Sequence, residues 1–170
     1  MSDKTPVTHD LTQLIDKIKD VRMAMLTTTD EHHTLHSRPM YTIKPDADGS
    51  LYFLTDAQSA KVYEVQKDSQ VNLSYANPDN NVYASVSGRA NAYRDEAKIA
   101  ELWNEPMRAW FPKGKDDPSI TILKVTVDKA EYWDSPNNML SRAYDYVRAV
   151  VTGETRKDDD VNQHAQVQPK

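Results

Sequence analysis

The sequence predicts a mainly β fold, a small antiparallel barrel with flanking helices. Six segments rich in β-branched and aromatic residues recur along the chain, and polar turns separate several of them. The segments do not follow the βαβ alternation of a doubly wound fold, which argues against a nucleotide-binding fold of that type. Gly88 lies inside a long expected strand, where a glycine often marks a bulge or a bend in a closed sheet.

The first half of the chain contains one expected helix and three expected strands. Apolar residues recur with helical spacing from Leu11 to Ile18, and Thr8 is suited to cap that helix. Alternating patterns and turn residues then predict strands at 22–28, 36–43 and 51–55.

The second half contains further helices between and after longer strands. Strands are expected at 71–76, 82–93 and 120–133, and helices at 59–67, from Asp95 onward, and at 140–151 before a stop at Gly153. Residues 154–170 carry a charged run and almost no large apolar side chain. We therefore expect one domain over 8–153 and a disordered tail over 154–170.

Composition narrows the classes of function. The chain has 170 residues, no cysteine and a formal net charge of −5. It has no basic tract that could follow a nucleic-acid backbone, and a single ligand phosphate would need only a local pocket. No apolar run approaches the ~18 residues of a membrane span, and no signal peptide opens the sequence, so we expect a cytoplasmic protein with neither nucleic-acid nor membrane partners.

The stretch from Arg38 to Lys61 contains a candidate anion site. Alternation places Arg38 on one face of its strand, and a turn followed by the 51–55 strand brings the chain back to a helix start. Ser59 is a good N-cap there, and Lys61 adds a positive charge in the first turn, beside free backbone N–H groups. A guanidinium, an ammonium and a helix N-terminus that meet at one point suit a phosphate. From spacing alone, a simple helix cap beside a solvated lysine remains the alternative.

The order of several motifs resembles a known family. Arg38-Pro39-Met40, Leu54-Thr55 and Ser59-x-Lys61 are similar to the flavin-binding pattern of the pyridoxamine 5′-phosphate oxidase-like split-barrel superfamily, and within it to the general stress protein 26-like group. The resemblance runs from about Leu11 to Gly153. It also includes Trp103, the segment 110–114, Asp117-Pro118 and the strand end 131–134.

This resemblance implies a six-stranded antiparallel split β-barrel of Greek-key type that forms a homodimer, with flavin in a groove between the subunits. FMN is the expected cofactor, and FAD is the alternative. Arg38, Ser59 and Lys61 would hold the phosphate, Thr55 would lie near the ring or the ribityl chain, and Pro39 and Met40 would pass beneath the ring. Trp133 would cover the ring edge, from the same or the second subunit, or else serve as an ordinary core tryptophan.

The chain also departs from the pyridoxamine-phosphate oxidases themselves. Their strand lysine, five residues after the arginine, falls here on Ile43, and no counterpart of their C-terminal Arg-x-His pattern is present. Vitamin B6 oxidation is therefore doubtful. No catalytic residue is nominated, because a flavin supplies its own redox chemistry. The histidines at 32, 33 and 36 do not have a convincing metal-ligand spacing, so no metal site is expected.

Three classes of function remain open. The first is a flavin-dependent oxidoreductase that acts on a small acceptor or a nicotinamide. The second is a stress-related protein that stores, buffers or senses flavin without fast turnover. The third is a structural homodimer whose groove is vestigial. Flavin bound to the purified protein would separate the third class from the other two.

Overall fold

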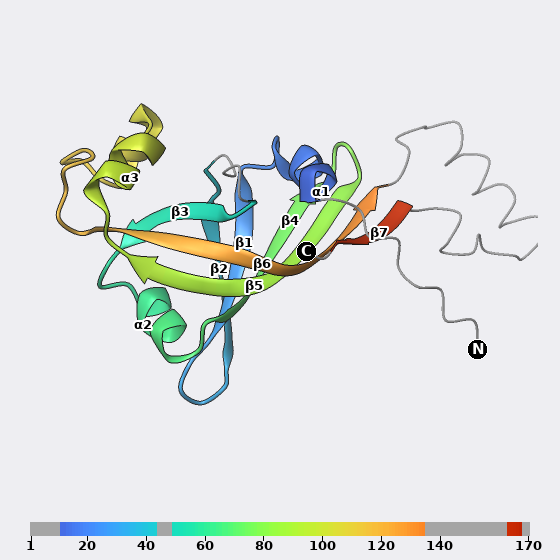
Figure 1. Cartoon of the computed structure of the whole chain (residues 1–170), viewed down its shortest axis with the longest axis horizontal. Coiled ribbons are helices and arrows are strands. Elements are labelled where there is room, and N and C mark those ends of the chain that lie inside the picture. Colours follow the sequence, from blue (N-terminus) through green and yellow to red (C-terminus); the bar gives the residue numbers. More distant parts are fainter. Residues whose placement is uncertain (1–10, 44–48, 135–162, 168–170) are drawn as a thin grey trace, which may run out of the picture.

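A computed structural model describes residues 11–43, 49–134 and 163–167, which form one curled antiparallel sheet with short helices around it (Figure 1). In chain order the elements are α1 (Leu11–Ile18), β1 (Met23–Thr29), β2 (Leu35–Tyr41), β3 (Leu51–Asp56), α2 (Ala60–Lys67), β4 (Gln70–Asn77), β5 (Val82–Tyr93), α3 (Glu96–Leu102), the 3-10 helix η1 (Glu105–Ala109), β6 (Ile120–Asp134) and β7 (Gln163–Val167).

The strand order confirms the predicted mainly β split-barrel fold. The sheet runs β2-β1-β4-β5-β6-β3, and β7 pairs with the far half of β6. Strands β4, β5 and β6 are consecutive neighbours, and β3 lies beside β6, which is the Greek-key arrangement. The sheet curls until β2 and β3 approach each other, where Ile43 and Tyr52 form an isolated bridge.

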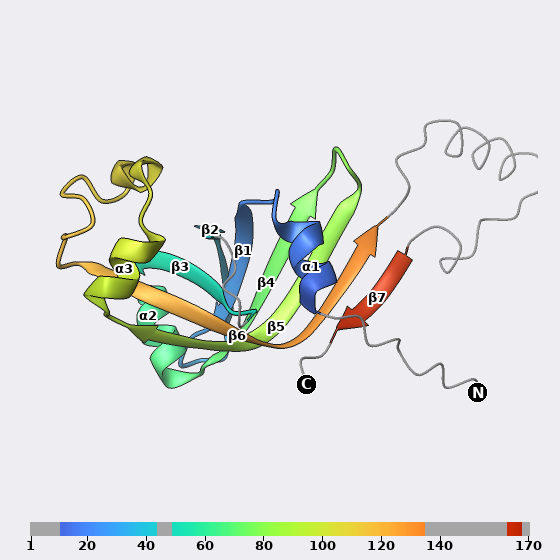
Figure 2. The ribbon, with the colours of Figure 1, turned by 45° about the horizontal axis from the view of Figure 1, so that its top comes forward.

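The core fills the inside of this curl in two clusters. The larger one contains Leu26, Phe53 and Leu73, all with no exposed surface, and α1 lies across β5 and β6 to cover its open end (Figure 2). The smaller cluster lies under α3 and η1, where Ile99, Met107 and Ile122 are buried. No helix of the described residues is long and apolar enough to cross a membrane.

Gly88 marks a bulge, as predicted, and its missing side chain lets β5 and β6 approach closely. The register of β5 against β6 shifts between Ser87 and Gly88. A Cβ built on Gly88 would lie 2.2 Å from the backbone oxygen of Thr126, a distance that real Cβ atoms do not show. The long strands β5 and β6 can therefore bend together at this point.

Two features differ from the expectations. Residues 163–167 form β7 and pair with β6, so the prediction of a disordered tail over 154–170 is wrong for these five residues. The 3-10 helix η1, which has a proline near its start, was not predicted. The expected helix at 140–151 and its stop at Gly153 lie outside the described residues.

Replacing Gly88 by alanine should destabilise the domain by about 2 kcal/mol or more, because a backbone oxygen rather than a flexible side chain must move. Urea unfolding followed by circular dichroism measures this loss. Thr126→Ala is the matched control, since it changes a side chain at the same place and leaves the carbonyl. Equal stability of Gly88→Ala and the wild type would contradict the close approach.

Candidate functional site

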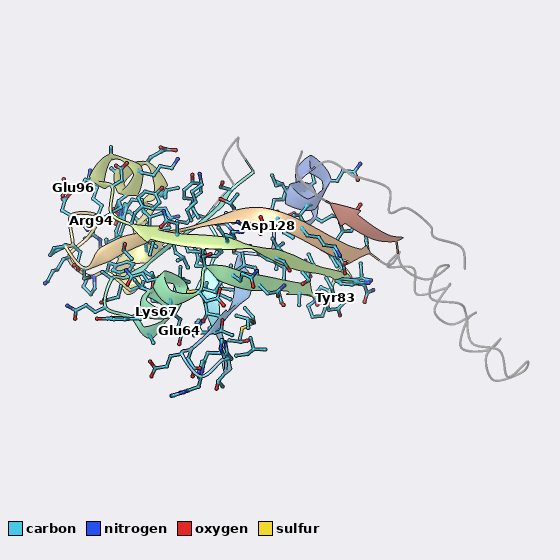
Figure 3. All side chains as sticks on the ribbon, turned by 60° about the horizontal axis from the view of Figure 1, so that its bottom comes forward. Glu64, Lys67, Tyr83, Arg94, Glu96 and Asp128 are labelled. Atoms are coloured by element: carbon cyan, nitrogen blue, oxygen red, sulfur yellow. The ribbon has the colours of Figure 1, made fainter. Side chains whose placement is uncertain are left out.

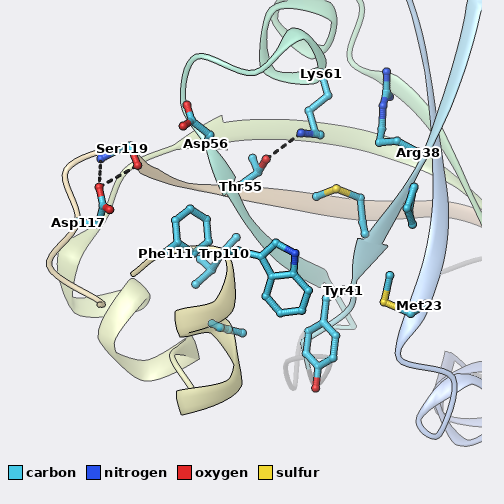
Figure 4. A pocket seen from close by; sticks show the side chains of 14 residues that line it. Met23, Arg38, Tyr41, Thr55, Asp56, Lys61, Trp110, Phe111, Asp117 and Ser119 are labelled. Atoms are coloured by element: carbon cyan, nitrogen blue, oxygen red, sulfur yellow. Dashed lines mark hydrogen bonds between the residues drawn. The ribbon is translucent and has the colours of Figure 1, made fainter. Parts of the chain in front are cut away.

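A cavity of about 380 Å³ lies where the curled sheet fails to close, between the edge strands β2 and β3 (Figure 4). Its walls come from β1, β2, β3, the start of α2, η1 and the loop before β6. The residues that line it are Met23, Arg38, Pro39, Met40, Tyr41, Leu54, Thr55, Asp56, Lys61, Met107, Trp110, Phe111, Asp117 and Ser119.

Strand alternation on β2 decides which side chains reach the interior. Met40 is buried in the core, and Arg38, two residues earlier, is partly buried on the same side of the strand. Pro39 is exposed and lies opposite Met25 on the outer face. A proline is tolerated here because β2 is an edge strand with one side unpaired.

One end of the cavity is cationic. Arg38 donates from Nη2 to Oε2 of Glu64 at 2.8 Å, and from Nη1 to the hydroxyl of Thr28. Lys61 donates from Nζ to the hydroxyl of Thr55 at 3.0 Å, a bond drawn in Figure 4. Burial, together with the nearby charge of Arg38, lowers the pKa of the Lys61 ammonium. An anion at this end would relieve the repulsion between the two cations.

Aromatic side chains form the opposite wall. Trp110 follows η1 and is 61% exposed, and its ring lies 6.2 Å from the ring of Tyr41 with the planes tilted by 36°. Phe111 is buried beside them against Trp103. The hydroxyl of Tyr41 accepts a hydrogen bond of 2.7 Å from Arg22. This wall offers flat apolar surface to a planar ring.

The loop before β6 places a carboxylate at the cavity. Asp117 is only 7% exposed, and its Oδ1 accepts from the backbone N–H of Ser119 at 2.9 Å and from the Ser119 hydroxyl at 2.8 Å. The backbone hydrogen bond from Ser119 is the main cause of the lowered pKa of Asp117, so this carboxylate stays ionised.

Five of the seven predicted site residues line the cavity together: Arg38, Pro39, Met40, Thr55 and Lys61. Ser59 is the N-cap residue of α2, as predicted, but it is not part of the wall. Its hydroxyl donates to the backbone oxygen of Asp56 at 2.7 Å and makes no capping bond to the helix. A phosphate contact from Ser59 would require this hydroxyl to turn.

Trp133 does not line this cavity. It lies near the end of β6, opposite Tyr83 of β5 and His164 of β7. Within one chain, cover over a ligand in the cavity would therefore come from Trp110 rather than Trp133. A role for Trp133 at a ligand depends on a second subunit.

The departures from the oxidase pattern also have a structural counterpart. Ile43 is buried in the smaller core cluster and forms a bridge with Tyr52, so position 43 has no cation where the oxidases have their strand lysine.

The histidines near the β1–β2 turn do not form a metal site. Nε2 of His36 lies 3.0 Å from Oδ2 of Asp30, and this contact is the main cause that lowers the pKa of Asp30 to about 2. Among the described residues no group of three acidic or histidine side chains could hold a metal.

The sequence did not single out Glu64, Tyr41 or Asp56 for the site. Glu64 had a signal, because it follows Lys61 by three residues and shares a face of the same helix. Trp110, Phe111 and Asp117 belonged to the family resemblance but carried no assigned role. Their convergence on the cavity depends on how η1 and its loop fold back over β3.

Comparison with known proteins identifies the family of this chain. The family model described as pyridoxamine 5′-phosphate oxidase like matches residues 9–158. The chain belongs to the pyridoxamine 5′-phosphate oxidase-like family. Protein bli-3 of Neurospora crassa is 26% identical over 163 residues, which cover 90% of this chain and 78% of that protein.

Solved structures of similar proteins confirm the fold. A general stress protein 26 from Jannaschia sp. CCS1 has a TM-score of 0.69 and 22% identity, and covers 93% of this chain and 97% of its own. The general stress FMN/FAD binding protein of Xanthomonas citri has a TM-score of 0.65 and 27% identity, with 75% of this chain and 89% of its own covered. The resemblance predicted from the sequence is thus confirmed.

The Lys61 ammonium should titrate below the ordinary lysine value of 10.5. NMR of the lysine side-chain nitrogens in labelled protein, assigned with Lys61→Arg, measures this. Because the folded state then binds fewer protons than the unfolded state just below pH 10.5, Lys61 makes stability rise with pH in that window. Inorganic phosphate should raise the pKa, whereas an unshifted titration would contradict the crowding of the two cations.

Proposed function

We propose that the chain binds flavin in the cavity between β2 and β3, with FMN as the first candidate and FAD as the alternative that shares its phosphate anchor. The observation that carries the proposal is the pairing of two cations, Arg38 and Lys61, with an aromatic wall at Trp110 and Tyr41 around one cavity. A phosphorylated planar ring requires both parts. The relative from Xanthomonas citri, described as FMN/FAD binding, supports the same ligand class.

Each wall has a separate task in this proposal. Arg38 and Lys61 bind the phosphate, and the Thr55 hydroxyl lies next to Lys61, where it can contact the ribityl chain. Met40 and the backbone at Pro39 support one side of the ring, and Trp110 shields the other side from water. Ser59 remains a candidate phosphate ligand through rotation of its hydroxyl.

A flavin-dependent oxidoreductase is the activity that this site supports best. Bound flavin supplies the electron-transfer chemistry, and the chain supplies binding, orientation and exclusion of water. The substrate would be a small electron acceptor or a nicotinamide, rather than a vitamin B6 phosphate, because buried Ile43 offers no charge at the oxidase lysine position. A buffering or sensing role without turnover is the alternative.

Two measurements test these statements in order. The visible spectrum of the purified protein, after incubation with FMN, should show bound flavin, and no binding at tens of micromolar FMN would contradict the proposal. Stopped-flow reduction of the bound flavin by NADH or NADPH then separates an oxidoreductase from a protein that only stores or senses flavin.

We also propose that two chains pair through the outer face of β1, β2, β4 and β5. Met25 lies at the centre of this face between Pro39 and Ser74, and small polar residues such as Ser85 surround it. Met25 is 42% exposed and Tyr83, at the far end of β5 (Figure 3), is 43% exposed. A face of small residues with exposed methionines suits burial against a second copy.

Loss of Arg38 should weaken FMN binding more than loss of Lys61. Arg38→Ala removes a planar fork and should cost at least ~10-fold in affinity, since charge-assisted hydrogen bonds contribute roughly 1.5–3 kcal/mol each. Lys61→Ala leaves the backbone N–H groups of the α2 start in place. Fluorescence titration with FMN measures both dissociation constants.

Riboflavin is the control for the Arg38 and Lys61 variants, because it lacks the phosphate. Neither substitution should change its weaker binding much. Equal losses for FMN and riboflavin would show that these residues support the fold rather than the phosphate. Melting temperatures belong to the same experiment, because Arg38→Ala leaves the Glu64 carboxylate, 12% exposed, without its ion-pair partner.

Met25→Lys should separate the proposed dimer. A lysine at the centre of the face would be desolvated without a partner, so the dimer dissociation constant should rise by about 100-fold or more. Analytical ultracentrifugation over a concentration series measures it. Tyr63→Lys, which replaces an apolar residue that is 66% exposed on α2, is the matched control. An unchanged dimer in Met25→Lys would place the interface elsewhere.

A further inference from the structure

At the cationic end of the cavity, Arg38 is already paired with a carboxylate that is not itself part of the cavity wall. Oε2 of Glu64 accepts from Arg38 at 2.8 Å and from the hydroxyl of Thr28 at 2.5 Å. The side chains of Arg38 and Glu64 are 21% and 12% exposed, so water screens this ion pair only weakly. Arg38 is therefore not a free cation that waits for an anion, because a fixed carboxylate already takes part of its charge.

A second carboxylate lies beside the second cation. Asp56 ends β3 and lines the cavity together with Lys61, and it acts on the Lys61 charge along with Glu64. The anion end thus has two cations, Arg38 and Lys61, and two carboxylates, Glu64 and Asp56. Asp56 is exposed, so water screens its charge, whereas the partly buried groups Arg38, Lys61 and Glu64 together carry a formal charge of +1 before any ligand arrives.

We propose that Glu64 sets the charge of the anion that this cavity accepts, so that the second negative charge of a doubly charged tetrahedral ester adds little to the affinity that the first charge provides. The inference rests on the proposed flavin site and deepens it. A phosphate monoester carries a charge of about −1.5 to −2 at neutral pH, whereas each phosphate of a diester carries a single charge. The second charge of the monoester meets Glu64 and Asp56 without a cation left to balance it.

The contacts of Glu64 make this effect a property of the fold. Glu64 lies on α2 (Figure 3), and the hydroxyl of Thr28 on β1 holds its carboxylate against Arg38. An incoming phosphate must share the guanidinium with this carboxylate rather than displace it, since displacement would leave a buried carboxylate unpaired.

The test compares three ligands that differ only at the 5′ position: riboflavin, riboflavin 5′-sulfate and FMN. The sulfate ester has the tetrahedral shape of the phosphate but carries one charge. Dissociation constants are measured by flavin fluorescence at pH 8, about two units above the second pKa of a phosphate monoester near 6, so that FMN is a dianion. The proteins are the wild-type chain of 170 residues, Glu64→Gln and Glu96→Gln.

The wild type should bind FMN and riboflavin 5′-sulfate within about threefold of each other, and both more tightly than riboflavin. Glu64→Gln keeps an oxygen that can accept from Arg38 and Thr28 but removes the charge, so FMN affinity should rise by about tenfold and exceed that of the sulfate ester. Glu96 is on α3, with a side chain 86% exposed, and Glu96→Gln removes the same charge away from the cavity without changing the ratio.

Two results would overturn the inference while leaving the flavin site intact. One is a wild type that binds FMN more than about threefold more tightly than the sulfate ester. The other is a folded Glu64→Gln variant that binds FMN more weakly, which would make Glu64 a support for Arg38 rather than a selector of charge. Failure of all three flavins to bind contradicts the proposed function itself, so the two failures are distinguishable.

Discussion

Incomplete closure of the sheet is the constraint on which the rest of the structure depends. A curled sheet that joined β2 to β3 along their whole length would have no edge strands and no gap between them for this cavity. Here the two strands meet only at the bridge between Ile43 and Tyr52, and they diverge beyond it. Arg38 of β2 and Thr55 of β3 line the resulting cavity from its two edge strands, and α2 and η1 contribute to its walls.

Local sequence rules predicted the elements well, because each depends on neighbours in the chain. The alternation in 82–93 matched β5 to the residue, Gly88 marked the bulge, and Asp95 caps α3 by accepting from the backbone of Lys98 at 3.0 Å. The 3-10 helix was not predicted, because a segment of five residues is too short to show a helical periodicity. The strand at 163–167 was not predicted either. It pairs with β6, which is distant in the sequence, and its polar residues give no pattern of burial.

The site was predictable only in part, for the same reason. The order of the motifs predicted that Arg38 and Lys61 lie at one site. It did not predict that Glu64 pairs with Arg38 and offsets part of its charge, because that contact depends on how α2 packs against the sheet. Trp133 and Trp110 show a second limit of the sequence, which concerns the choice between two similar residues. Both are aromatic residues near strand or helix ends, and sequence spacing cannot tell which one the chain folds toward the cavity.

The pairing of β7 with β6 has a consequence for how the molecule behaves in solution. β6 pairs with β3 only along its first half, through Val125, and the stretch from Ala130 to Asp134 would otherwise present a row of unpaired amide and carbonyl groups. Such an open edge is a template for indiscriminate strand addition between molecules. The five residues of β7 pair with that row, so β7 protects this edge of β6 from strand addition and aggregation.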